Sequence, residues 1–139
     1  MTTYSVTRTI EAPADRLWAL LTNASGYTDW NPTIVSLDGA IEDGSTIALV
    51  STLNPNRTFK LKVSDVNAPR SMVWSDGMPL GLFKGVRTFT LDEEDGVTTF
   101  GMEEIHSGLL EPLISKSIPD MTESFEEFAD GLKAAAESP

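Results

Sequence analysis

Hydrophobic and polar positions alternate along the middle of this chain, and segments with helical spacing lie on either side. The clearest alternation is at residues 58–64, where Phe59, Leu61 and Val63 point one way and the intervening lysines point the other. A period of two is typical of a strand with one buried face. Further strands are expected at residues 47–53, 71–75, 83–91 and 97–106. The pattern therefore predicts a β-rich chain.

The last two of these strands form a predicted hairpin around Asp95 and Gly96. Asp-Gly is a favoured two-residue turn, so Glu94 should face Val97. The register then pairs Leu91 with Phe100, Phe89 with Met102, Arg87 with Glu104 and Gly85 with His106, all on one face. A four-residue loop would slide the register by two residues but leave the same side chains on that face. An opposite-charge pair is thus expected among aromatic residues.

Helical spacing begins after a first strand that should end near Ile10. Ala12-Pro13 is expected to open a helix, because proline suits a first helical turn. Leu17 and Leu21 continue the helix, and a second short helical turn is predicted at residues 27–30.

A longer helix is predicted from Asp120 onward, after a short apolar segment at residues 109–116. Its apolar stripe consists of Met121, Phe125, Phe128, Leu132 and Ala135. The predicted order is a strand, two short helices, about six strands and a long helix.

The chain has 139 residues, no Cys and a formal net charge of -11. This length is typical of one domain, taken here as residues 1–139. Without Cys there is no disulfide framework, thiolate nucleophile or Cys-based metal site. Excess negative charge repels polyanions, so no nucleic acid partner is expected. The one His and the scattered carboxylates lack metal-ligand spacing, and neither a metal nor another cofactor is predicted.

The N-terminal residues lack the basic region and apolar run of a signal peptide. No stretch approaches the ~20 apolar residues that a membrane span needs. We therefore expect no membrane span, a cytoplasmic location, and a monomer or homodimer in solution.

Three segments together give the chain a resemblance to a known family. They are Ala12-Pro13 with Trp18, the aromatic run at residues 27–32, and residues 100–110 followed by Pro112-Leu113. These segments resemble the START-like, helix-grip superfamily, also called SRPBCC, and in particular its polyketide cyclase and dehydrase-like branch. The resemblance implies an α+β fold in which a curved antiparallel sheet of about six to seven strands and a long C-terminal helix enclose an apolar cavity.

The resemblance also implies inward polar residues on the last hairpin, which match Arg87 and Glu104. Related sequences often carry His at the first of these positions, and Arg87 departs from that pattern. Arg87, Glu104 and His106 are the candidate catalytic residues, because Arg offers a fork of donors, Glu accepts, and His titrates near neutrality. The alternatives are a structural ion pair and a core or rim His with a satisfied hydrogen bond. We expect His106 to have no Asp or Glu partner two or three positions away, and therefore no catalytic triad around it.

A large aromatic and methionine set is the candidate wall of the cavity, since one sheet and one helix leave a concavity that only large side chains fill. The predicted ligand-binding residues are Trp30, Phe59, Met72, Trp74, Phe83, Arg87, Phe89, Phe100, Met102, Glu104, His106, Met121 and Phe125. The alternative is that most of the apolar members are ordinary core. Gly77, Gly81 and Gly85 indicate a mobile loop over the cavity entrance, and the alternative is a plain loop.

These features favour binding or carriage of a small hydrophobic molecule, aromatic or lipid-like. Two alternatives stay open. The first is a cyclase or dehydratase-like enzyme acting on a polyketide-like substrate, in which Arg87 polarises a carbonyl and Glu104 or His106 moves a proton. The second is a protein-interaction module, like the chaperone-activating relatives, that uses its acidic surface.

Overall fold

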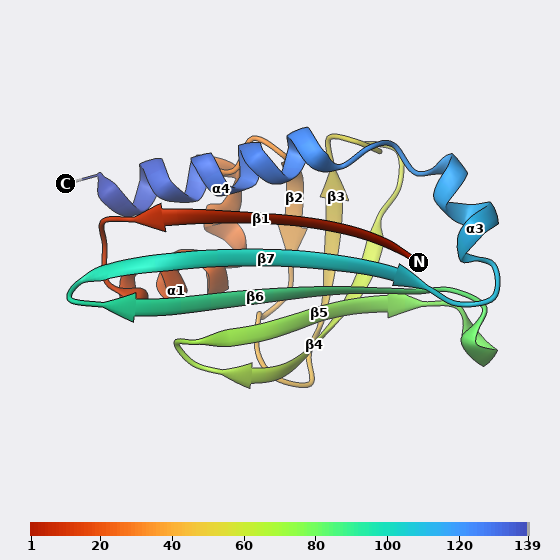
Figure 1. Cartoon of the computed structure of the whole chain (residues 1–139), viewed down its shortest axis with the longest axis horizontal. Coiled ribbons are helices and arrows are strands. Elements are labelled where there is room, and N and C mark those ends of the chain that lie inside the picture. Colours follow the sequence, from red (N-terminus) through yellow and green to blue (C-terminus); the bar gives the residue numbers. More distant parts are fainter. Residues whose placement is uncertain (139) are drawn as a thin grey trace.

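A computed structural model describes residues 1–138 and has one antiparallel sheet of seven strands. The strands are β1 (Thr2–Ile10), β2 (Ile34–Asp38), β3 (Thr46–Ser51), β4 (Phe59–Asn67), β5 (Ser71–Gly77), β6 (Lys84–Glu94) and β7 (Val97–Ser107). Their spatial order is β1-β7-β6-β5-β4-β3-β2, so β1 lies beside β7 and every other pair of neighbours is consecutive in sequence. The sheet curls toward the side that carries the long helix (Figure 1).

The helices of the described residues lie at the edges and on the inner side of this curl. They are α1 (Ala14–Thr22), α2 (Tyr27–Trp30), α3 (Glu111–Ile114) and α4 (Thr122–Glu137), with 3₁₀ turns at Ala24–Gly26, Pro79–Gly81 and Ser115–Ser117. In Figure 1, α4 runs beside β1 along the length of the sheet. This is the predicted α+β helix-grip fold. Within residues 1–138, no helix combines the length and apolar character needed to cross a bilayer.

The β6–β7 hairpin has the predicted register. Asp95 and Gly96 form the turn with positive φ angles of 53° and 80°, and Glu94 faces Val97. All four predicted inward pairs are present, from Leu91–Phe100 through Gly85–His106. The two-residue turn is thus confirmed, and it places Arg87 directly opposite Glu104.

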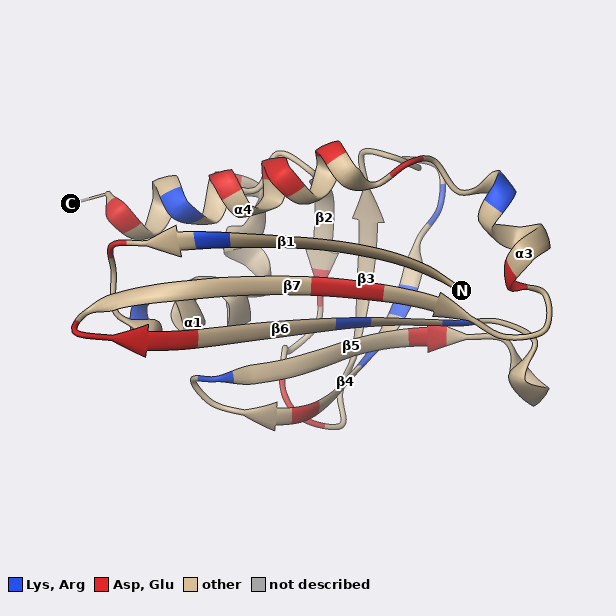
Figure 2. Cartoon of the chain, viewed as in Figure 1, with Lys and Arg blue, Asp and Glu red and all other residues tan. Residues whose placement is uncertain are grey.

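The inner face of α4 buries a continuous stripe of Phe125, Phe128, Ala129, Leu132 and Ala136. The prediction of Ala135 in the last turn was wrong. The stripe advances by three or four residues per turn, so it reaches Ala136 and leaves its neighbour half-buried. Acidic residues mark the opposite side of the helix (Figure 2). Arg8 of β1 joins the helix to the sheet through Asp130, with 2.9 Å between Nε and Oδ1.

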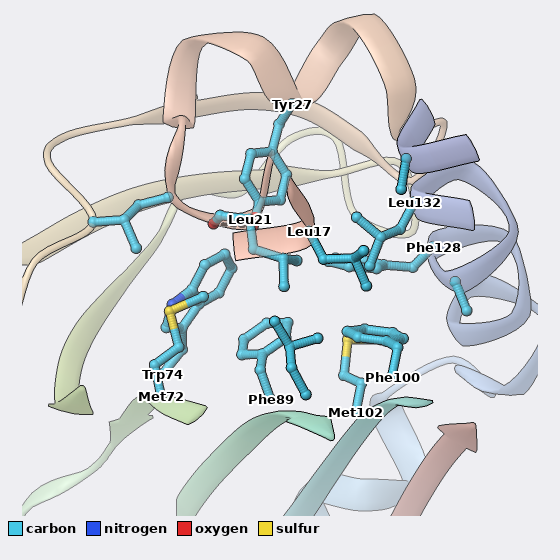
Figure 3. Packing of buried hydrophobic residues seen from close by; sticks show 14 of the residues in the cluster. Leu17, Leu21, Tyr27, Met72, Trp74, Phe89, Phe100, Met102, Phe128 and Leu132 are labelled. Carbon is cyan, nitrogen blue, oxygen red and sulfur yellow. Dashed lines mark hydrogen bonds between the residues drawn. The ribbon is translucent and has the colours of Figure 1, made fainter. Parts of the chain in front are cut away.

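The core is filled where α1, α2 and the second half of α4 meet the sheet. Figure 3 shows side chains from these helices directed at the aromatic residues of the hairpin. The buried Tyr27 hydroxyl donates a hydrogen bond to the Leu21 carbonyl oxygen at 2.6 Å. We call this region the packed end. Its residues include Leu17, Leu21, Tyr27, Met72, Phe89, Phe100, Phe128 and Leu132.

Candidate functional site

A cavity of about 830 Å³ lies between the sheet and the N-terminal part of α4. Nine of the predicted ligand-binding residues line it: Phe59, Trp74, Phe83, Arg87, Met102, Glu104, His106, Met121 and Phe125. They come from β4, β5, β6, β7, α4 and the segments just before β6 and α4, which are brought together by the curl of the sheet. We call this region the hollow end.

Three other predicted wall residues, Met72, Phe89 and Phe100, do not line the cavity. They are fully buried in the packed end. The ring of Phe128 lies 6.0 Å from that of Phe89 and is stacked 6.3 Å from that of Phe100, between centroids. Phe128 of the helix therefore covers Phe89 and Phe100, and full burial assigns all three side chains to the core.

Trp30 also lies outside the cavity wall. Its ring packs against Tyr27 at 4.8 Å and against Phe128 at 5.7 Å, between centroids. It borders a separate, shallower groove between α2 and the acidic face of α4. The position of Trp30 follows from α2, which turns its aromatic residues toward α4 and away from the hollow end.

The polar cluster on the cavity wall is built around Glu104. Its Oε1 accepts a hydrogen bond from Arg87 Nε at 2.7 Å, and its Oε2 lies 2.6 Å from His106 Nε2. The Arg87 guanidinium lies over the Phe125 ring, 4.9 Å from the centroid. One carboxylate thus holds both an arginine and an imidazole at the surface of the cavity.

The expectation that His106 has no Asp or Glu partner two or three residues away was wrong. Glu104 stands two residues before it, and the period of two in a strand puts both side chains on the same face. The imidazole is buried between the rings of Tyr4 and Phe83, and its Nδ1 has no hydrogen-bond partner within residues 1–138. His106 is therefore part of a Glu–His pair through Nε2, and its Nδ1 has no hydrogen-bond partner among the described residues.

The electrostatics of the cluster keep Glu104 ionised. Burial alone would raise its pKa, but the charge of Arg87 and the hydrogen bond from His106 outweigh burial and lower the pKa to about 2. A carboxylate with so low a pKa is a weak base, and both of its oxygens are already engaged. Its two oxygens hold the Arg87 guanidinium and the His106 imidazole in place.

Sequence reasoning missed Asp76 and Arg57, which also line the cavity. Asp76 continues the inward series of Met72 and Trp74 on β5, so extending that alternation by one step would have found it. Arg57 has no such signal, because it precedes β4 in an irregular segment. Its guanidinium lies 4.5 Å above the centroid of the Phe59 ring.

The glycine-marked loop is the connection between β5 and β6, residues 78–83. Gly77 ends β5 and Gly85 lies within β6, and only Gly81 belongs to the connecting turn. Leu80 in that turn is 91% exposed. Within residues 1–138, no three His, Cys, Asp or Glu side chains are grouped so as to hold a metal ion.

A curved sheet that grips a C-terminal helix, with a cavity between them, defines the START-like class of proteins. The family model described as polyketide cyclase / dehydrase and lipid transport matches residues 1–137. The chain belongs to this family. No curated protein matches the chain.

Solved structures with similar folds support the same class. A hypothetical protein of Helicobacter pylori has a TM-score of 0.79 at 12% identity, with 98% of this chain and 88% of that chain covered. A START superfamily protein of Mycobacterium smegmatis has a TM-score of 0.71 at 18% identity, with 97% of each chain covered. DynU16, a protein from the dynemicin biosynthetic locus, has a TM-score of 0.72 at 16% identity, with 98% of this chain and 47% of that chain covered. At these identities the likeness concerns the fold.

Proposed function

We propose that this protein binds and carries a small, largely hydrophobic molecule in the cavity of the hollow end. The observation that supports this most is the cavity itself, whose volume of about 830 Å³ falls in the range of small-molecule sites. Aromatic and methionine side chains supply much of the wall, and the Arg87–Glu104–His106 cluster supplies orientation. A ligand with an apolar body and one polar group suits such a wall.

Arg87 is the residue that would hold the polar group of the ligand. Its Nε is engaged by Glu104, which leaves the terminal nitrogens of the guanidinium for a carbonyl or an anionic oxygen. The side chain is 15% exposed, so its hydrogen bonds form in a largely desolvated setting. Arg87→Met should therefore weaken carbonyl-bearing or anionic ligands more than plain hydrocarbons.

A cavity-filling variant tests the proposal directly. Ser124 of α4 lines the cavity, whereas its neighbour Glu123 is exposed. The neutral dye N-phenyl-1-naphthylamine should bind the wild type saturably, and Ser124→Trp should lower its affinity at least about tenfold by occupying the space. Glu123→Trp adds the same ring outside the cavity and should bind like the wild type. Absence of saturable binding, or equal binding by Ser124→Trp, would reject the cavity as a ligand site.

The Glu104–His106 pair favours a second candidate function, acid–base catalysis of the cyclase or dehydratase kind. Arg87 would polarise a carbonyl, and His106 would move the proton, since Glu104 is held ionised. A poly-β-keto thioester offered as substrate separates the two functions. Enzymatic turnover that is lost in His106→Asn, with dye binding retained, would establish the enzyme. Binding without turnover would leave the carrier function.

A further inference from the structure

Asp76 is a second carboxylate on the cavity wall, and the Arg87–Glu104–His106 cluster does not use it. It lies at the end of β5, paired in register with Gly85 of β6, which is in turn paired with His106 of β7. The three residues form a row across the sheet, and all three border the cavity. The middle position of this row has no side chain.

The missing side chain leaves a notch between the two polar groups. A Cβ built on Gly85 would lie 3.1 Å from Oδ1 of Asp76 and 3.6 Å from Cδ2 of the His106 ring. Both groups therefore border the space directly above Gly85. A small polar group of a ligand entering this notch would meet the Asp76 carboxylate.

The Asp76 carboxylate keeps its hydrogen-bonding capacity for such a group. Within the described chain, its surroundings act on it through burial and charge, without a hydrogen bond. The charged and titratable groups that face it are Arg57, Arg87, Glu104 and His106. Arg57 is placed over the Phe59 ring, and the other three are bound to one another. Of the carboxylates that residues 1–138 place on the cavity wall, only Asp76 has both oxygens free of hydrogen bonds.

We propose that Asp76 accepts a hydrogen bond from a hydroxyl group of the bound molecule, so that the cavity selects apolar ligands bearing a phenol, enol or alcohol. This proposal rests on the proposed binding function. The guanidinium groups of Arg57 and Arg87 offset the carboxylates of Asp76 and Glu104, so the formal charges of these four groups do not favour a cationic ligand over a neutral hydroxyl. Burial, followed by the charge of Glu104, raises the pKa of Asp76, which strengthens the carboxylate as an acceptor.

The test compares ligands that differ only in the donor. Wild-type protein at neutral pH should bind 2-naphthol at least about tenfold more tightly than 2-methoxynaphthalene, because a hydrogen bond to an ionised group discriminates strongly. Asp76→Asn keeps the shape and replaces the charge with a weaker acceptor. It should reduce the preference to about threefold or less without changing the affinity for 2-methoxynaphthalene. Asp92→Asn alters an exposed acid of β6 and should retain the full preference.

Gly85→Ala provides an independent second variant. The added methyl group would enter the notch, where its closest neighbour is the end of the Asp76 side chain, so the fold is expected to accommodate it. The preference for 2-naphthol should fall as in Asp76→Asn, while naphthalene still binds. Equal binding of the two ligands by the wild type, or an undiminished preference in Asp76→Asn, overturns the role of Asp76. Failure of naphthalene itself to bind the wild type overturns the binding function, and the Asp76 proposal with it.

Discussion

The packed end and the hollow end are built from the same strands, yet one is solid and the other holds a cavity. Along β6 and β7, Phe89 faces Met102 at the boundary between them, and two steps further on Gly85 faces His106. Phe89 of the first pair packs against Phe128 of α4, whereas the second pair has the His106 ring on one strand and no side chain on the other. The contrast shows that the position of a cavity in this fold depends on the volume of the side chains along the hairpin. It also depends on the helix residues that face the hairpin.

The largest expected difference between the two ends concerns aromatic truncation. Phe128→Ala should lower the free energy of unfolding by about 3–5 kcal/mol, because the ring is 1% exposed and packs against four other aromatic rings. Phe59→Ala removes a half-buried ring from the cavity wall and should cost about 1 kcal/mol. Urea denaturation of both variants measures the difference. Similar losses would mean that the hollow end is packed as tightly as the other.

A second prediction concerns the ionised Glu104 carboxylate of the hollow end and its effect on stability. The pKa of Glu104 is lowered to about 2 in the folded chain, from its ordinary value of 4.5. A lowered pKa stabilises the fold above the unfolded-state value, and this contribution disappears as the pH falls through the folded-state value. At neutral pH, Glu104→Gln should therefore be less stable than wild type by about 3 kcal/mol.

The pH dependence separates this effect from simple loss of packing. The stability difference between wild type and Glu104→Gln should shrink steadily between pH 4.5 and pH 2. Glu103→Gln, at the exposed neighbouring position on the other face of β7, serves as the control and should change stability by less than about 0.5 kcal/mol. A difference that stays constant over this pH range would contradict the electrostatic account.

The smallest effect concerns a hydrogen bond within the packed end. Tyr27→Phe removes the hydroxyl that donates to the Leu21 carbonyl and should cost about 1 kcal/mol. Tyr4→Phe, at a half-buried ring beside the cavity, is the matched control and should cost less. The midpoint of thermal unfolding compares the two. An equal shift for both variants would show that the Tyr27 hydrogen bond adds nothing to the packed end.

For this chain, the sequence predicts local backbone geometry better than it predicts the volume and position of the cavity. Asp95 and Gly96 define a turn through their backbone preferences alone, and the register of the hairpin follows from the turn. Whether Phe89 borders a ligand or the core depends on Phe128, which is distant in sequence and reaches it only through the packing of α4. Alternation on β5 places Asp76 inward but says nothing about the free space above Gly85. That space depends on three strands at once.

The register of the β6–β7 hairpin also limits how this region of the chain changes in length through evolution. Inserting or deleting one residue between Arg87 and the turn would reverse the face of every residue of β6 before the change. Arg87 would then leave the cavity while Glu104 stayed in it, unless a β-bulge absorbed the extra residue. Descendants of this gene can therefore lengthen or shorten the hairpin readily by two residues per strand, and single-residue changes should be found only where a bulge accompanies them.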